Sequence, residues 1–190
     1  MSTRSFNVFS ERIVVWPGES FKFGVYPSEV GTGAEIEVTI SGVSLTPSGP
    51  YNVSPTGPVT VTAPGTAAEG TITCDPPDPG VTTQNIIVAA LKADVCGDVQ
   101  VNPGDYFIWE NTQESPVLIT AAPGNENFWP LPDEEHVVPA NGWLPLQIPT
   151  DAIVNDEENP ACELKLTVNG KDFICNPRGT QPRIIVGSSK

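Results

Sequence analysis

The sequence predicts an all-β protein made of two tandem Greek-key β-sandwich domains. The first observation is a repeated phrase: residues 15–23 read VWPGESFKF, and residues 101–109 read VNPGDYFIW. Each copy is followed by short apolar runs, a cysteine with prolines close behind it, and an apolar closing run. The second observation is that 21 prolines and 17 glycines fall between apolar runs, where they mark turns. The repeat divides the chain into 1–92 and 93–190, each long enough to bury a core.

Short strands with period-two alternation are expected throughout the first domain. Apolar side chains at alternate positions in 21–25 and again in 36–40 fall on one face, while polar residues between them face away. Residues 59–62 and 71–74 continue the same period. Residues 86–88 form the apolar closing strand of this domain.

The second domain carries a similar series of strands and one irregular region. Its strands are expected at 106–109, 117–120, 144–148, 164–168, 171–175 and 183–186. Asn169–Gly170 predicts a two-residue hairpin turn, because both residues accept positive φ. Residues 89–93 are the only plausible helical turn in the sequence, at the junction of the domains. Residues 121–163 are interpreted as a loop insert in which a binding site is most expected.

The charge of the chain argues against nucleic acid as a partner. The net charge is -14, with only nine lysines and arginines, so the electrostatic attraction that drives nucleic-acid binding is missing. Anionic membranes are disfavoured for the same reason, and no apolar stretch approaches the length of a membrane span. Residues 1–6 lack a signal-peptide core. Three explanations stay open: the protein is retained in the cytosol, a signal has been removed, or it is exported by another route. We favour an extracellular, surface or particle-associated location.

Four cysteines, at positions 74, 96, 162 and 175, allow several states. No Cys-x-x-Cys spacing exists, which disfavours structural zinc. If the protein works outside the cell, we expect Cys162 to bridge to Cys175 or to Cys96, while Cys74 stays a lone core thiol. A cytosolic protein should show four thiols instead.

The second domain resembles the cupredoxin family. Residues 101–105 and 107–111 match a Val-x-x-Gly-Asp turn followed by an aromatic strand, and residues 115–117 stand where the family has Pro-His. Residues 173–175 match the aromatic-x-Cys segment, which leads to the closing strand at 184–186. The likeness covers roughly residues 95–187 and, more faintly, 13–88. It implies a cupredoxin-like sandwich, with an immunoglobulin-like sandwich as the alternative.

The copper site of that family is not expected here. A type-1 site needs two imidazoles, a thiolate and usually an axial methionine. The chain has one histidine, His136, and only Met1, and Val117 stands in the place of the first histidine. Cys175 alone matches the ligand set, and we interpret it as a buried thiol. No cofactor is therefore expected from the resemblance.

Two classes of function follow from these observations. The leading hypothesis is a non-enzymatic structural or interaction protein, such as a subunit of a surface, filament or particle assembly, whose partner is another protein or a second copy. The alternative is a carbohydrate-binding module, because tryptophan on a β-sandwich loop can stack on a sugar ring. Its residues would be Trp129 and Trp143, with Asn127, Asp133 and Glu135 as polar partners.

Calcium is a further possible ligand, since hard cations take carboxylate oxygens from flexible loops. The candidate ligands are Asp133, Glu134 and Glu135 in one acidic run, and Asp156, Glu157 and Glu158 in another. Neither run has the alternating spacing of a dedicated calcium loop.

A hydrolase is the third interpretation. It would centre on His136 as the general base, with Ser115 or Ser54 as the nucleophile. The sequence has no Gly-x-Ser-x-Gly elbow to support it.

Overall fold

The computed structural model describes residues 3–25, 35–77, 84–175 and 181–187. The chain forms two compact units, Met1–Ala89 and Ala90–Lys190. In the described ranges the only helical element is one short 3-10 turn, η1 (Glu126–Phe128), and the other elements are strands. The predicted all-β class is therefore confirmed. No helix in these ranges is long and apolar enough to cross a membrane.

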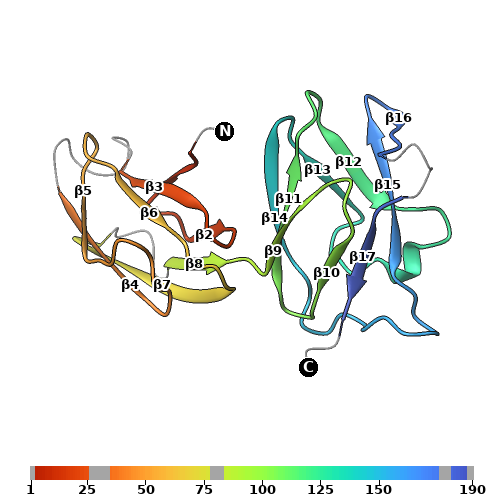
Figure 1. Cartoon of the computed structure of the whole chain (residues 1–190), viewed down its shortest axis with the longest axis horizontal. Helices are drawn as coiled ribbons and strands as arrows, with labels where there is room; N and C mark the ends of the chain where they lie inside the picture. Colours follow the sequence, from red (N-terminus) through yellow and green to blue (C-terminus); the bar gives the residue numbers. More distant parts are fainter. Residues whose placement is uncertain (1–2, 26–34, 78–83, 176–180, 188–190) are drawn as a thin grey trace. The chain divides into compact units, whose positions relative to one another are not determined.

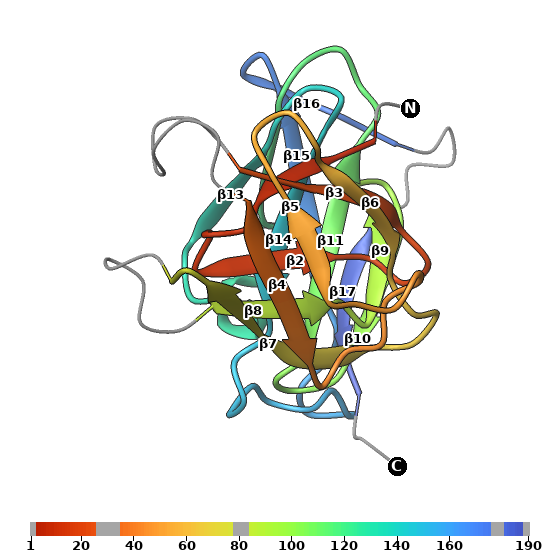
Figure 2. The same ribbon diagram turned by 90° about the vertical axis from the view of Figure 1, so that its left-hand side faces the viewer.

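The first unit is built from two sheets (Figure 1). One sheet has the order β1 (Ser5–Asn7), β3 (Ser20–Gly24) and β6 (Val59–Thr62). The other has the order β2 (Arg12–Val15), β8 (Gln84–Val88), β7 (Ala68–Asp75), β4 (Ile36–Ser41) and β5 (Tyr51–Val53). The pairs β1/β3 and β2/β8 are parallel and the others are antiparallel. The β4–β5 hairpin faces the viewer in Figure 2.

The core of the first unit lies between its two sheets. Phe21 and Phe23 of β3 are fully buried and meet edge to face at 5.1 Å between ring centroids. Ile36 and Val38 of β4 belong to the same buried cluster from the opposite sheet. The predicted alternation at 21–25 and 36–40 is thus confirmed, except that Ile40 at the end of β4 is only partly buried.

The second unit has the same strand order. Its smaller sheet runs β9 (Leu91–Asp94), β11 (Tyr106–Asn111) and β14 (Gly142–Gln147). Its larger sheet runs β10 (Val99–Val101), β17 (Arg183–Val186), β15 (Cys162–Val168), β12 (Val117–Ala121) and β13 (Glu135–Val138), and the short β16 (Lys171–Asp172) pairs with β15. Again the first two strands in sequence lie parallel to later ones, β9 to β11 and β10 to β17. Two sheets with crossing connections in each unit are consistent with a cupredoxin-like β-sandwich.

The repeated phrase forms the same turn in both units. Gly18 and Gly104 adopt positive φ, 73° and 87°, as the third residue of a tight turn requires. The next residue in each copy, Glu19 or Asp105, donates its backbone N–H to the carbonyl three positions earlier at 3.1 Å. Its carboxylate accepts the backbone N–H of that same residue, at 3.1 Å for Glu19 and 2.9 Å for Asp105. The acidic residue of the phrase therefore closes the turn.

Three local predictions are corrected by the structure. Residues 89–93 do not form a helical turn, because Leu91 and Ala93 pack on the core with the alternation of strand β9. The strand predicted at 171–175 is shorter in the structure and consists of the two residues of β16. Beyond it, the Phe173 backbone N–H donates a hydrogen bond to the Leu166 carbonyl. Residues 121–163 are not a continuous loop insert, because they contain β13 as well as the predicted strand that became β14.

The disulfide joins Cys96 to Cys175, with 5.3 Å between their Cα atoms. The expectation that Cys162 is bridged, to either partner, is wrong. Cys162 is buried at the start of β15. The chain leaves β15 at the Asn169–Gly170 turn, passes through β16 and brings Cys175 to Cys96, in the turn that precedes β10. Cys175 is consequently not the thiol we expected. Cys74 lies outside the bridge as a buried thiol, as predicted.

Candidate functional site

Two connections on the second unit are longer than their counterparts on the first. Residues 122–134 join β12 to β13, where the first unit uses 42–50 between β4 and β5. Residues 148–161 join β14 to β15, where the first unit uses 63–67 between β6 and β7. We call the facing parts of these loops, residues 126–134 and 149–159, the loop site. Loops added to a rigid sandwich are where binding residues are most often found.

Hydrogen bonds to β15 hold the first of these loops. The Ala122 N–H donates to the Glu163 carbonyl at 2.8 Å, and the Asn125 side-chain oxygen accepts the Glu163 N–H at 3.3 Å. Farther along, the Trp129 indole N–H donates to the Asp133 carbonyl. The Trp129 ring stacks on His136 of β13, with 5.9 Å between centroids and 24° between planes. The loop is therefore fixed at both ends before any ligand arrives.

The second loop is ordered by its own polar side chains. One oxygen of Asp156 accepts the backbone N–H groups of Glu158 and Asn159 at 2.9 and 2.8 Å. These hydrogen bonds lower the pKa of Asp156. The Asn155 amide donates to the Asn159 carbonyl at 3.2 Å, and its oxygen accepts the Val186 N–H. The loop is thus tied to the closing strand β17.

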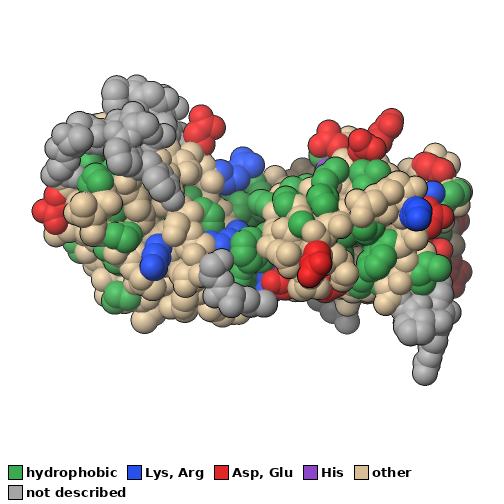
Figure 3. Space-filling model, turned by 90° about the horizontal axis from the view of Figure 1, so that it is seen from above, with side chains coloured by type: hydrophobic (Ala, Val, Ile, Leu, Met, Phe, Trp, Pro, Cys, Tyr) green, Lys and Arg blue, Asp and Glu red, His purple; other side chains and the backbone are tan. Residues whose placement is uncertain are grey.

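The loop site is strongly negative. No lysine or arginine occurs between Lys92 and Lys165, whereas acidic residues are frequent in this stretch. Burial raises the pKa of the Cys162 thiol to about 11, and the charges of Glu126 and Glu163 add to the effect. Figure 3 shows acidic side chains beside hydrophobic ones on one face of the second unit. A cationic ligand would therefore be attracted to this surface.

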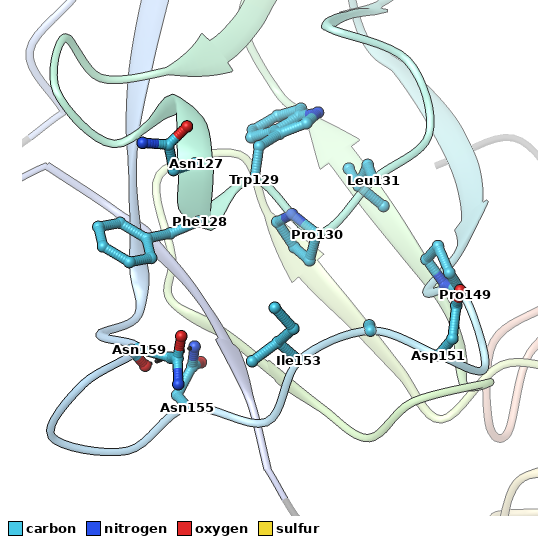
Figure 4. Close-up of a pocket in the computed structure, with 11 residues that line it drawn as sticks. Asn127, Phe128, Trp129, Pro130, Leu131, Pro149, Asp151, Ile153, Asn155 and Asn159 are labelled. Atoms are coloured by element: carbon cyan, nitrogen blue, oxygen red, sulfur yellow. Dashed lines mark hydrogen bonds between the residues drawn. The ribbon is translucent and has the colours of Figure 1, made fainter.

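Two hollows open at the loop site, and Trp129 lines both. The first, of about 250 Å³, lies between the two loops and has apolar walls from Phe128, Pro130 and Ile153 (Figure 4). Ile153 is 65% exposed although it is a large apolar side chain. Asn127 and Asp151 add polar groups at the edge of the same hollow.

The second hollow, of about 350 Å³, lies between the first loop and the end of β12. It is lined by Trp129, Thr120, Ala121, Glu126 and Glu134. An indole beside two carboxylates is suited to a cation or to the hydroxyl groups of a sugar.

The residues predicted for sugar binding lie in different places. Trp129 and Asn127 line the first hollow, and Asp133 contributes the carbonyl that holds the Trp129 ring. Glu135 and Trp143 are not among the residues that line either hollow. Trp143 lies on β14 in the smaller sheet, where its indole N–H donates to Glu110 at 3.3 Å.

Sequence reasoning missed the apolar part of the site. Phe128, Pro130 and Ile153 were not among the predicted residues, and neither was Glu126. One signal was available: Ile153 belongs to a short apolar run, Ala152–Val154, in an otherwise polar connection, where no strand or helix period accounts for it.

Within the second unit, the structure does not bring Ser115 and His136 together. His136 is buried, which lowers its pKa, while Asp133 opposes the effect in part. Its Nε2 atom has no hydrogen-bond partner in the described ranges. Ser115 lies four residues before Ile119, the β12 partner of His136, and strand geometry puts about 13 Å between those positions. Ser54 belongs to the first unit.

The arrangement of side chains gives little support for a metal site. Within the residues that the structure describes, no three His, Cys, Asp or Glu side chains converge on one point. Calcium binding by Asp133, Glu134, Asp156 and Glu157 stays a prediction, with the Asp156 carboxylate already bound to its own loop. A type-1 copper centre does not fit, because Cys175 is held in the disulfide with Cys96.

Comparison with known proteins gives structural neighbours and no sequence relatives. No protein-family model and no curated protein sequence matches the chain. A copper nitrite reductase from Nitrosomonas europaea aligns over 92% of this chain and 82% of its own, at 9% identity and a TM-score of 0.32.

Two further neighbours are about twice as long as the matched region. A multi-copper oxidase from Pediococcus acidilactici covers 94% of this chain and 50% of its own, at 11% identity and a TM-score of 0.27. A copper-containing nitrite reductase from Thermus scotoductus covers 94% and 54%, at 12% identity and a TM-score of 0.29. Such proteins have cupredoxin-like folds, but scores this low support no statement about activity.

Proposed function

We propose that this chain is a non-enzymatic interaction protein whose loop site contacts another protein. The observation that carries the proposal is the apolar hollow between Phe128, Pro130 and Ile153, with Ile153 exposed at its edge. Burial of the exposed Ile153 side chain and of the Phe128 ring contributes about 2 kcal/mol or more to the free energy of association. Because hydrogen bonds already fix both loops, little ordering entropy opposes binding. The separation of His136 from Ser115 supports the proposal that the protein is not an enzyme.

The partner class includes a second copy of the chain, as expected for a surface, filament or particle subunit. The shared strand order and the shared turn support the view that the two units are a tandem duplicate. Sedimentation velocity and electron microscopy over a wide concentration range would test self-assembly. The wild type is compared with Ile153→Asp, which changes one exposed side chain of the loop site. We expect association by the wild type that Ile153→Asp weakens. A wild-type protein that stays monomeric and captures no partner would count against the proposal.

A location outside the cytosol is part of the proposal. The Cys96–Cys175 bridge supports it, because disulfides persist mainly in oxidising compartments. Mass spectrometry of the alkylated, unreduced protein from its natural source would test this location. Four alkylated cysteines would contradict it.

Carbohydrate binding is the second candidate, favoured by the hollow in which Trp129 lies beside Glu126 and Glu134. A sugar that stacks on this ring would quench tryptophan fluorescence. Trp129→Ala should remove the response, whereas Trp143→Ala is the control because that ring belongs to the other sheet. A broad glycan array without a hit would exclude this candidate.

A further inference from the structure

We propose that the loop site recognises a cationic polypeptide segment in which an arginine or lysine adjoins an apolar side chain. The inference rests on the proposed protein-binding function and specifies the chemistry of the partner. It requires three properties of the site: a negative field, an apolar hollow, and a group that joins the two.

The negative charge lies at both hollows. Glu126 and Glu134 line the second hollow and Asp151 lines the first. The stretch from residue 93 to residue 164 contains no lysine or arginine. Lys165, the cross-strand neighbour of Thr120 at the second hollow, forms an ion pair with Asp172 at 3.1 Å. Charge of one sign at the rim of a surface steers oppositely charged partners and rejects others of the same sign.

The apolar hollow has the size of one side chain. Its volume of about 250 Å³ lies below the range of roughly 300–1,000 Å³ that is typical of sites for small-molecule ligands. Phe128, Pro130 and Ile153 form one apolar wall of the hollow, and Asp151 adds a carboxylate elsewhere in the lining. Because that wall offers no hydrogen-bonding side chain, an aliphatic or aromatic side chain is the occupant that loses least on leaving water against it. A buried apolar anchor of this kind dominates the energy of many interfaces.

Trp129 joins the two hollows, since this residue lines both. An arginine or lysine beside this indole would gain a cation–π interaction while it pairs with Glu126 or Glu134. Burial keeps the neighbouring His136 neutral near pH 7, so the stacked imidazole does not repel such a cation. Neighbouring hollows with one shared wall therefore fit two adjacent side chains of one segment, one apolar and one cationic.

The experiment uses fluorescence anisotropy with the full chain and three synthetic peptides. One peptide alternates arginine and leucine, and in the other two glutamine or glutamate replaces every arginine. The site variants are the double variant Glu126→Gln, Glu134→Gln and the single variant Ile153→Asp. The double variant Glu11→Gln, Glu69→Gln is the matched control, because it changes the net charge equally at exposed positions of the first unit. Circular dichroism and thermal unfolding confirm that each variant is folded.

We expect only the arginine peptide to bind, with affinity that falls between about 50 and 300 mM salt. Both site variants should weaken it about tenfold, and the control by less than about twofold. Equal weakening by the control would overturn the inference, because the attraction would then belong to the overall charge.

Two other outcomes separate this inference from the proposed function. If the glutamine peptide binds as tightly as the arginine peptide and Ile153→Asp abolishes both, the loop site binds protein but the cationic partner is wrong. If no peptide binds and Ile153→Asp alters no association of the protein with itself or others, both proposals are overturned.

Discussion

The first unit joins β4 to β5 and β6 to β7 through residues 42–50 and 63–67, whereas the second unit uses residues 122–134 and 148–161 for the same connections. The strand order is the same in both units. The difference shows that this sandwich accepts longer loops without a change in its sheets, because loop closure entropy rises only slowly with length. The added residues face one another on the second unit and line its first hollow. The binding hypotheses therefore concern the second unit.

The two units also differ in the contacts that stabilise their equivalent turns and in their disulfide content. In the first, Glu19 is buried and accepts a hydrogen bond from the Arg4 guanidinium at 2.6 Å, and the Arg4 cation lies over Phe6 and Trp16. In the second, the Asp105 carboxylate at the equivalent position of the turn accepts hydrogen bonds from the backbone and side-chain N–H groups of Asn102. The disulfide belongs to the second unit alone. These contrasts predict that changes at matched positions have unequal effects.

Removal of the disulfide should have the largest effect. The double variant Cys96→Ala, Cys175→Ala removes the constraint on a loop with a sequence separation of 79, which corresponds to about 4.5 kcal/mol in the chain-entropy description. Hydrogen exchange of the full chain should show lower protection in the second unit and unchanged protection in the first.

Alkylation gives an independent check on this bridge. The folded, unreduced protein should resist thiol reagents, because Cys74 and Cys162 are buried and the pKa of Cys162 is about 11. After denaturation without reduction, two cysteines should be alkylated. Labelling of all four would show that no bridge exists.

The matched turn variants should have the next largest effect. Glu19→Ala leaves the partly buried Arg4 guanidinium without its carboxylate and is expected to lower the free energy of unfolding by about 3 kcal/mol. Asp105→Ala removes hydrogen bonds that are only partly buried, at a cost of about 1 kcal/mol. Denaturant unfolding of both variants measures the difference. Equal losses would mean that the Arg4 contact adds nothing to the turn.

The repeated phrase allowed much of the fold to be predicted, because its residues act locally. Gly18 and Gly104 take the positive φ that a proline–glycine turn requires, and Asn169–Gly170 forms the predicted two-residue hairpin. Strand β9 was missed for the opposite reason. Residues 89–93 have good helix propensity, and only the pairing with β11 and the packing of Leu91 make them a strand.

The site was less predictable than the fold, because it depends on contacts distant in sequence. The hollow needs residues 127–131 and 149–159 side by side, and no local pattern fixes that approach. Trp129 was identified as a loop residue, but its stacking on His136 was not. The disulfide partner was missed since Cys96 and Cys175 meet only after the sheets have formed.

Acidification should have the smallest effect and should again separate the two units. His136 is the only histidine of the chain and lies in the second unit, where burial holds its pKa below its ordinary value. In the unfolded state that pKa is about 6.5. Between these two values the unfolded chain binds more protons, so stability is fully present above the unfolded pKa and declines as the pH falls toward the folded one. Hydrogen exchange is measured at pH 7.5 and at pH 5.5 and corrected for the intrinsic exchange rate. On acidification, the second unit of the wild type should lose more protection than the second unit of His136→Gln. The first unit should lose the same protection in both proteins. The same loss in the two proteins would show that the acidic side chains, and not the imidazole, set the pH dependence.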